Sequence, residues 1–458
     1  QDMLSHNHFI SPLRRQKSEY ISKNTKGQSA LWTYGISGDL PIVLVVVKNT
    51  DETDIVYEVL KAHEFWSVKG LKVDLVILNE EENSYIHPLF SLIKEAVSSS
   101  HAHNLINKPG GVYILNRNNV ADEDLPLLYA VSRIILRADG GSLSEQLKTT
   151  YRKQTVDVKQ TQRDDKCTQQ AAYMPEYSER IHDKRELKFF NELGGFSHDG
   201  SEYIIHLEKG QNTPAPWVNI ISNPNFGSIV SEAGPVYTWC ENSRENKLTP
   251  WSNDPVSNTP GEALYLTDWK RGSTWTITPL PARDEGSYVI THGFGYSMFR
   301  HVSSGVEQSL IQFVPIDDNV KISLVKLKNL TKEKINISLT YYVRPVLGVS
   351  DQLTAMHIKT SMGEGDVLFI ENPYNDEFPG RIAFLDVSEK ERSVTGDRKD
   401  FIGSGSISSP EGLQQKKLSG SVGIGFDPCA AMQIDVDLEP DEDKEVDNSV
   451  ETSAKGFF

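Results

Sequence analysis

A polar loop between two short strand-like runs holds the residue types best suited to chemistry. It lies within residues 231–268, and Trp251 stands there among amide, carboxylate and guanidinium side chains. Aromatic rings stack on the C–H faces of sugars, and polar groups of these kinds hydrogen-bond sugar hydroxyls. The loop therefore predicts a sugar subsite made of Asn242, Arg244, Trp251, Asn253 and Asp254.

Two alternatives for this loop stay open at the level of sequence. In the first, Trp251 packs against an edge of the domain, as loop aromatics commonly do. In the second, Arg244 and Asp254 pair with each other and only stiffen the loop. Trp217, held between prolines in TPAPWVN, is a further candidate for sugar contact, and its alternative is to plug a corner of the domain.

The net charge limits the partners that this chain can have. Its 458 residues carry a formal net charge of −16. A nonspecific nucleic-acid or anionic-membrane partner would need a concentrated surface of lysine and arginine. We therefore expect neither nucleic acid nor membrane as a partner.

Cysteine and histidine spacing gives no metal site. Cys167, Cys240 and Cys429 are few and far apart, which favours a reducing compartment over a disulfide framework. The histidine pairs at 6 and 8 and at 101 and 103 lack a third ligand nearby in the sequence, so only adventitious metal binding is expected.

The N-terminal residues contain no apolar core of a secretory signal, and no run approaches the ~18 apolar residues of a membrane span. These observations favour a cytoplasmic location.

The first part of the chain has the pattern of a parallel sheet with covering helices. Continuous apolar runs at 42–47, 73–78 and 111–115 predict buried strands, and helical periodicity separates them. We expect a further helix from Leu125 to Leu136. Residues 1–140 are thus predicted to form a small α/β domain.

The hydrophobic period changes to two after a polar stretch. Residues 141–186 are highly charged and predict a linker that is partly helical. Alternating runs across residues 187–445 then predict a large antiparallel β-sandwich. Residues 446–458 are expected to be a frayed tail, and the overall fold class is α+β.

Several segments, in order along the chain, carry a resemblance to a known family. They are SALWTYGISGDLPIVLV at 29–45, GLKVDLVILNE at 70–80, FFNELGGFSHDGSEYII at 189–205, TPAPWVNIISNPNFG at 213–227, SRENKLTPWSNDPVSNTPGEALYL at 243–266, HGFGYSMF at 292–299, TYYVRPVLG at 340–348 and GDRKDFIGSGS at 396–406. The chain resembles the inverting glycoside phosphorylases of glycoside hydrolase family ninety-four, most closely the branch that acts on β-1,2-glucans.

The resemblance implies a sandwich of the supersandwich type, a helical linker and an (α/α)6 barrel that carries the general acid and the phosphate-binding residues. This chain ends about 20 residues after DPCAAMQIDVDL at 427–438. We therefore expect the barrel to be absent, no catalytic residue to be present and the chain to be inactive alone. The implied reaction is phosphorolysis to α-glucose 1-phosphate, with inorganic phosphate as co-substrate and no metal or other cofactor.

Two functional hypotheses follow from the sequence. In the first, the chain is a noncatalytic N-terminal part of a β-1,2-glucan phosphorylase or related enzyme, and it contributes sugar-contacting loops and contacts to the barrel domain or to a second subunit. In the second, it is a standalone module for β-glucan binding or dimerisation. The expected partners are a β-1,2-glucooligosaccharide, an (α/α)6 barrel domain and a second copy in a homodimer.

Overall fold

The computed structural model describes residues 18–81, 88–146 and 186–454. The chain forms two compact units, the first from Gln1–Cys167 with Pro373–Pro379 and the second from Thr168–Asn372 with Gly380–Phe458. Most of the predicted linker at 141–186 lies outside the described residues.

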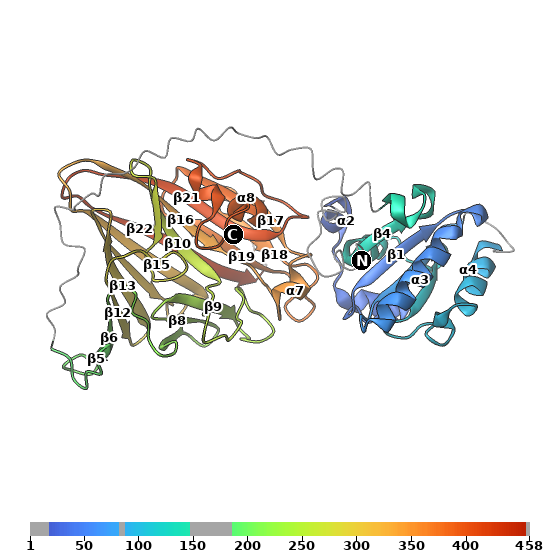
Figure 1. Cartoon of the computed structure of the whole chain (residues 1–458), viewed down its shortest axis with the longest axis horizontal. Helices are drawn as coiled ribbons and strands as arrows, with labels where there is room; N and C mark the ends of the chain where they lie inside the picture. The colour runs from blue at the N-terminus through green and yellow to red at the C-terminus, as the bar shows by residue number, and fades with distance from the viewer. Residues whose placement is uncertain (1–17, 82–87, 147–185, 455–458) are drawn as a thin grey trace. The chain divides into compact units, whose positions relative to one another are not determined.

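The first unit is built on a four-stranded parallel sheet in the order β3-β2-β1-β4. Figure 1 draws this unit in blue to blue-green, with β1, β4, α3 and α4 labelled. Every residue of β1 and β2 is buried, as expected of parallel strands covered on both faces. Its elements are α2 (Ser18–Lys23), η2 (Gln28–Tyr34), β1 (Ile42–Val47), η3 (Thr50–Glu52), α3 (Asp54–Val68), β2 (Asp74–Asn79), α4 (Pro88–Ser98), η4 (His101–Asn104), β3 (Val112–Asn116), η5 (Arg117–Asn119), α5 (Leu125–Val131), β4 (Ser132–Arg137) and η6 (Ala138–Gly140).

Alternation along β1 divides its side chains between two cores. Val43, Val45 and Val47 join a cluster with residues of α3 and α4, whereas Leu44 and Val46 join one with residues of α5 and η2. Successive strand side chains point to opposite faces, so a wholly apolar strand feeds both layers. The predicted strands and the α3 helix between them are thereby confirmed.

The helix expected from Leu125 to Leu136 is wrong in its second half. Helix α5 ends at Val131, and Ser132–Arg137 forms strand β4, which pairs with β1 in parallel. A short apolar run does not distinguish strand from buried helix by periodicity, and here pairing with β1 decides.

Residues 373–379 belong to the first unit although they lie between two strands of the second in the sequence. Tyr374 packs on the core cluster that contains Leu31 and Ile36. Asp376 accepts a hydrogen bond from the backbone N–H of Ser29 at 2.7 Å. A Cβ at Gly27 would overlap the Asp376 carboxylate, so glycine allows this close approach.

The second unit contains three antiparallel sheets. A five-stranded sheet has the order β11-β10-β16-β21-β20, a ten-stranded sheet has the order β17-β18-β19-β22-β15-β14-β13-β12-β6-β5, and a three-stranded sheet has the order β7-β8-β9. The elements are β5 (Gly194–Phe196), β6 (Glu202–Leu207), β7 (Val218–Ser222), β8 (Phe226–Ser231), β9 (Gly234–Cys240), β10 (Glu262–Asp268), β11 (Ser273–Thr276), β12 (Tyr288–Gly293), β13 (Tyr296–Ser303), β14 (Val306–Phe313), β15 (Val320–Asn329), β16 (Ile335–Val343), α7 (Asp351–Thr354), β17 (Lys359–Met362), η7 (Glu364–Asp366), β18 (Leu368–Glu371), β19 (Arg381–Val387), β20 (Arg392–Asp397), α8 (Arg398–Ile402), η8 (Glu411–Gln414), β21 (Pro428–Leu438) and β22 (Asp443–Ala454).

The core of the second unit lies between the two larger sheets. One hydrophobic cluster contains Leu264 and Leu339 of the five-stranded sheet together with Phe299, Leu310 and Val325 of the ten-stranded sheet. Strand β14 alternates buried and half-buried residues along its whole length, which is the period-two pattern of a sandwich strand. The predicted large antiparallel sandwich is confirmed.

A buried ion pair connects the sheets inside this core. Lys321 of β15 and Glu262 of β10 have fully buried side chains, and the Lys321 Nζ lies 2.5 Å from Glu262 Oε2. The same carboxylate accepts hydrogen bonds from Thr238 Oγ1 at 2.7 Å and from the Tyr341 hydroxyl at 2.5 Å. Every oxygen of this carboxylate is therefore engaged, as a buried charge requires.

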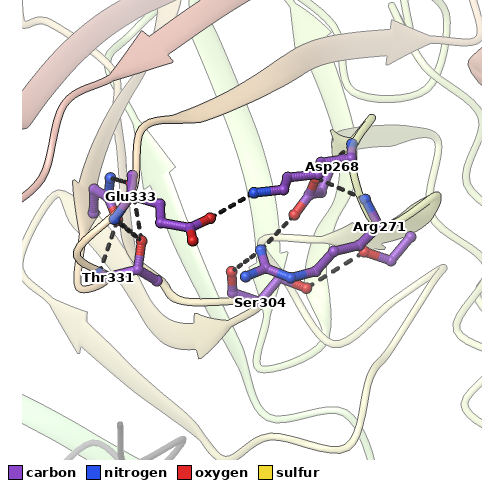
Figure 2. A network of polar contacts seen from close by, with 8 residues as sticks. Asp268, Arg271, Ser304, Thr331 and Glu333 are labelled. Atoms are coloured by element: carbon purple, nitrogen blue, oxygen red, sulfur yellow. Dashed lines mark hydrogen bonds and ion pairs between the residues drawn. The ribbon is translucent and has the colours of Figure 1, made fainter. Parts of the chain in front are cut away.

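A second polar cluster, which we term the turn clamp, joins the β10–β11 and β13–β14 hairpin turns to the connection between β15 and β16 (Figure 2). Arg271 Nη1 donates to Asp268 Oδ2 at 2.6 Å and to the Ser304 carbonyl at 2.9 Å. Lys270 Nζ donates to Glu333 at 2.5 Å. The turns follow β10, β13 and β15, so the turn clamp links the five-stranded sheet to the ten-stranded one.

The C-terminal residues differ from the expected frayed tail. Strand β22 runs over Asp443–Ala454 and pairs with β15 on one side and β19 on the other. Its sequence is acidic and poor in apolar residues, so hydrophobic patterning gave no signal for a central strand.

Candidate functional site

The second unit contains a cavity of about 380 Å³, which we call the Trp251 cavity. The loop between β9 and β10, the end of β16 with the residues after it, the start of α7 and the start of α8 all contribute to its wall. The lining residues are Lys247, Pro250, Trp251, Ser252, Thr259, Pro260, Tyr342, Arg344, Val349, Ser350, Asp351, Gln352, Arg398 and Ile407.

Trp251 is held by stacking on one of its two faces. Its ring lies 4.8 Å from that of Tyr237, with an interplanar angle of 8°. The ring centroid of Tyr237 is in turn 5.1 Å from that of Trp239. The Trp239 indole lies against Gly227 of the neighbouring strand, where a Cβ would overlap it. Trp251 nevertheless stays 40% exposed. The tryptophan is thus packed, as in the first alternative left open by the sequence, and is also accessible, as a sugar subsite requires.

Three cationic side chains line the Trp251 cavity. Arg344 Nη2 lies 2.6 Å from Asp351 Oδ2, and Arg398 Nη1 lies 3.2 Å from Asp427 Oδ2. Lys247 Nζ donates to the Val349 carbonyl at 3.0 Å, a neutral acceptor. A guanidinium carries five N–H donors, so one contact to a carboxylate leaves most of its donors for other acceptors.

Tyr342 also lines the Trp251 cavity and is 1% exposed. Its ring stacks on Phe401 at 4.8 Å and 15°. Its hydroxyl has no hydrogen-bond partner among the described residues, and Arg398 is its charged neighbour. Burial raises the pKa of the Tyr342 phenol, so at neutral pH it keeps its proton and is a donor.

Two of the predicted subsite residues shape the loop and do not line the Trp251 cavity. The Asn242 side chain accepts hydrogen bonds from the backbone N–H groups of Arg244 and Glu245, both at 2.9 Å. Arg244 is 82% exposed in its side chain, and its Nε lies 3.3 Å from Glu245. The structure therefore gives Arg244 a neighbouring carboxylate as partner and records no contact to Asp254 among the described residues.

The other two lie at the tip of the same loop. Asn253 has a φ of 49°, a left-handed conformation that asparagine tolerates well. Asp254 Oδ1 accepts from the Val256 backbone N–H at 2.9 Å, and Oδ2 accepts from Ser257 Oγ at 2.6 Å. The Ser257 hydrogen bond, with the backbone donors, lowers the pKa of the Asp254 carboxyl. Asp254 thus stabilises the turn that follows Trp251.

Trp217 is half-buried and packs on the main core of the second unit. Its ring contacts Tyr203 edge-on at 5.8 Å, and its backbone N–H donates to Glu232 at 2.7 Å. It is not among the residues that line the Trp251 cavity.

The residues that sequence reasoning did not single out come from later parts of the chain. Tyr342 and Arg344 follow from the end of β16, Asp351 from α7 and Arg398 from α8. Tyr342, Arg344 and Arg398 belong to TYYVRPVLG and GDRKDFIGSGS, the segments that carried the family resemblance. That resemblance was the signal that could have identified them.

Neither a metal centre nor a membrane helix is found in the described part of the chain. No group of three or more His, Cys, Asp or Glu side chains there could hold a metal ion. His101 Nε2 lies 3.0 Å from His63 Nδ1, and His103 Nδ1 lies 3.2 Å from the Ser100 carbonyl. None of the helices in the described ranges combines the length and the apolarity that crossing a bilayer requires.

The sequence is similar to a known domain family and to several known proteins. Residues 201–453 match the family described as "Glycosyl hydrolase 94, supersandwich domain". The cyclic beta-(1,2)-glucan synthase NdvB of Rhizobium meliloti (strain 1021) is 30% identical over 94% of this chain and 16% of that protein. An N,N'-diacetylchitobiose phosphorylase of Vibrio furnissii is 26% identical over 54% of this chain and 32% of that protein.

The chain thus spans about a third or less of the length of these relatives. Among solved structures, a putative aldose 1-epimerase from Escherichia coli K12 aligns with a TM-score of 0.32 and 9% identity, covering 52% of this chain and 99% of that one. The family match covers more than half of the sequence. The chain belongs to the glycosyl hydrolase 94 family, and residues 201–453 are its supersandwich domain.

Proposed function

We propose that this chain is a noncatalytic, substrate-facing part of a glycosyl hydrolase 94 enzyme that acts on β-1,2-glucans. In the complete enzyme the reaction is phosphorolysis to α-glucose 1-phosphate, and a barrel domain supplies the proton donor. The observation that carries the proposal is the Trp251 cavity, in which a fixed indole stands beside several hydrogen-bond donors.

The geometry of Trp251 suits a pyranose ring. One face of the indole rests on Tyr237, which fixes its orientation before any ligand arrives. Its remaining exposed surface can cover the apolar face of a glucose unit, while Arg344 and Gln352 lie in the same wall to hydrogen-bond hydroxyls. A ring that is already immobilised loses little conformational entropy on binding, and this favours affinity.

The choice of β-1,2-glucan is supported by a relative that aligns with nearly the whole chain. The Rhizobium meliloti protein, named as a cyclic beta-(1,2)-glucan synthase, aligns with 94% of this chain, including the first unit. The chitobiose phosphorylase aligns with only 54%. We therefore favour β-1,2-glucooligosaccharides over chitobiose as the ligand.

The noncatalytic role is supported by the chemistry of the Trp251 cavity. Phosphorolysis needs a carboxylic acid that can protonate the bridging oxygen. Among the described residues that line the cavity, Asp351 is the carboxylate. Its Oδ2 lies 2.6 Å from Arg344 Nη2, in an ion pair. A carboxylate engaged by a guanidinium has no proton to donate, so we assign it a binding or structural role.

The test is a titration of the purified chain with sophorose and β-1,2-glucotetraose, measured by calorimetry. Trp251→Ala should weaken binding about tenfold, since an aromatic contact is worth about 0.5–1.5 kcal/mol in addition to the apolar area that it buries. Trp32→Ala is the matched control, because Trp32 is 63% exposed but belongs to the first unit. Equal binding by the parent and Trp251→Ala would contradict the sugar site.

A turnover assay tests the noncatalytic role separately. The chain alone, with β-1,2-glucooligosaccharide and phosphate, should release no glucose 1-phosphate above background. Sustained release by the purified chain, abolished by a substitution within it, would show that it holds its own proton donor.

A homodimerisation role is a second candidate, and one observation favours it. Val218 and Ile220 of the edge strand β7 are 52% and 57% exposed, and Phe294 in the β12–β13 turn is 86% exposed. Asn219 joins these elements by donating to the Gly293 carbonyl at 3.0 Å. Sedimentation should show a dimer that Ile220→Asp dissociates, and a monomeric parent at all concentrations would exclude this role.

A further inference from the structure

The charge of the Trp251 cavity points beyond neutral glucan. Among the described residues that line it are three cationic side chains, Lys247, Arg344 and Arg398, and a single carboxylate, Asp351. The whole chain carries a net charge of −16, so a locally cationic wall runs against its general composition. A cationic wall attracts anions and raises their local concentration.

The contacts of these cations leave donors to spare. Arg344 meets Asp351 through Nη2, and Arg398 meets Asp427 through Nη1. The Nε of Arg398 is buried and has no partner in the described part of the chain. Lys247 donates to the Val349 carbonyl, a neutral acceptor that does not balance its charge.

Tyr342 gives an independent indication of a missing acceptor. Tyr342 is 1% exposed and lines the Trp251 cavity, and the described residues offer no acceptor to its hydroxyl proton, since its polar neighbour Arg398 can only donate. A buried polar group without a partner is costly, so such groups normally find an acceptor in the protein, in water or in a ligand. A protonated phenol beside a guanidinium offers two donors of the kind that oxyanions accept.

We propose that the Trp251 cavity binds an acidic saccharide, a sugar bearing a carboxylate or phosphate oxyanion, with the sugar on Trp251 and the oxyanion on Arg344, Arg398 and Lys247. This inference rests on the sugar site proposed above and extends its ligands from neutral to acidic sugars. Trp251 is the most exposed of the four side chains, and the guanidinium side chains of Arg344 and Arg398 are 33% and 29% exposed. The arrangement therefore places a stacking surface and a more enclosed charged surface in one cavity.

The experiment compares ligands that differ in one group. Methyl β-D-glucuronide and methyl β-D-glucoside differ only in a carboxylate against a hydroxymethyl group, and glucose 6-phosphate carries the phosphate form. Inorganic phosphate and sulfate test the oxyanion without a sugar. Binding to the full chain is followed by ligand-observed NMR at low ionic strength and again in added salt.

We expect the glucuronide and the sugar phosphate to bind at least ~10-fold tighter than the glucoside, because charge-assisted hydrogen bonds are stronger than neutral ones. Added salt should reduce that preference, since a partly exposed charged site is screened. Trp251→Ala should weaken all three sugars, whereas Arg344→Gln should weaken the two acidic sugars more than the glucoside, because it removes a charge-assisted hydrogen bond from the acidic pair and a weaker one from the neutral sugar.

Lys247→Gln is a second variant that tests whether a loss of binding reflects the site and not partial unfolding. Within residues 18–81, 88–146 and 186–454, Lys247 has no carboxylate partner and its amine donates to the Val349 carbonyl, so its loss leaves no buried charge behind there. It should lower the preference for acidic sugars with an unchanged melting temperature. Lys209→Gln is the matched control, because Lys209 is 72% exposed and pairs with Glu285 outside the Trp251 cavity.

The outcomes separate this inference from the proposed function. Equal binding of glucoside and glucuronide, both lost in Trp251→Ala, would overturn the acidic ligand and keep the sugar site. Inorganic phosphate binding as tightly as the sugar phosphate would overturn the saccharide part of the proposal. Binding of acidic sugars alone would support it and exclude neutral glucan as the ligand of this cavity, whereas no binding of any sugar would overturn both.

Discussion

The turn clamp and the Trp251 cavity are both built from charged side chains on the same sandwich, yet they differ in how those charges are used. In the turn clamp, Arg271 divides one nitrogen between Asp268 and the Ser304 carbonyl, and Asp268 also accepts two backbone N–H groups (Figure 2). In the cavity, Arg344 and Arg398 each meet one carboxylate. Polar groups that satisfy one another hold the fold together, whereas polar groups with spare donors indicate a ligand.

This comparison predicts opposite readouts for substitutions in the two kinds of cluster. Substitutions in the turn clamp or in the Lys321–Glu262 pair, where polar groups satisfy one another, should reduce stability and leave sugar binding unaffected. Changes in the Trp251 cavity should reduce binding and leave stability nearly unaffected.

The largest loss of stability is expected for the buried ion pair. Lys321→Met should lower the free energy of unfolding of the second unit by about 3–5 kcal/mol, because it leaves Glu262 buried without its countercharge. Denaturant unfolding followed by tryptophan fluorescence measures this. Adding Glu262→Gln should restore part of the lost free energy of unfolding. If Lys321→Met alone unfolds within about 1 kcal/mol of the parent, the buried ion pair does not stabilise the fold as proposed.

His292 should make the stability of the second unit depend on pH. Burial lowers its pKa from 6.5 to about 4 in the folded protein. Below pH 6.5 the unfolded chain takes up a proton that the folded chain refuses, so stability falls as pH drops toward 4 and then levels off. The loss amounts to about 3 kcal/mol at most.

His292→Asn provides the control for that profile. Asparagine cannot titrate, and it can still contact Ser297, whose hydroxyl lies 2.9 Å from His292 Nδ1. Between pH 7 and pH 5 the free energy of unfolding should fall less in the variant than in the parent. If the free energy of unfolding changes with pH by the same amount in both proteins, His292 is not the titrating group.

Within the turn clamp, Asp268→Ala should cost about 2–3 kcal/mol, since it removes the acceptor of several hydrogen bonds at a residue that is 1% exposed. Lys270→Gln should cost less than about 1 kcal/mol, because the Lys270–Glu333 pair is more than 70% exposed on both sides. Thermal unfolding of both variants ranks their losses of stability. A larger loss for Lys270→Gln than for Asp268→Ala would contradict this prediction.

The smallest stability effects are expected in the Trp251 cavity. Arg344→Gln and Trp251→Ala should each cost less than Asp268→Ala in unfolding, about 1 kcal/mol, since the Arg344 side chain keeps 33% and Trp251 keeps 40% of its surface in water, whereas Asp268 is 1% exposed. The same proteins should show the binding losses described above. A large stability loss with unchanged binding would make the cavity a structural cluster like the turn clamp.

Local signals predicted much of the fold. The runs at β1 and β2 are short, wholly apolar and bounded by turn residues, so their burial followed from composition alone. Strand β22 escaped prediction because its stability comes from pairing with β15 and β19, and not from its own apolar residues. The second half of the predicted helix at 125–136 failed for the same reason, since pairing with β1 makes it a strand.

The site was only partly predictable. Trp251 was identified from its loop because aromatic and polar residues cluster there in sequence. Arg344 and Arg398 lie far along the chain, and they reach the same cavity because β16 pairs with β10 and α8 follows β20. No spacing rule relates such positions, so only the sheet topology, or the family resemblance, could have brought them together.

The short segment from Pro373 to Pro379 makes the first unit discontinuous in sequence. Cutting the gene after residue 146 would remove Tyr374 from the apolar layer around Leu31 and would leave the Ser29 amide without its carboxylate cap. Anyone who produces that unit by itself should therefore supply residues 373–379, either fused through a spacer or added as a synthetic peptide, and the peptide should raise the melting temperature of the isolated unit.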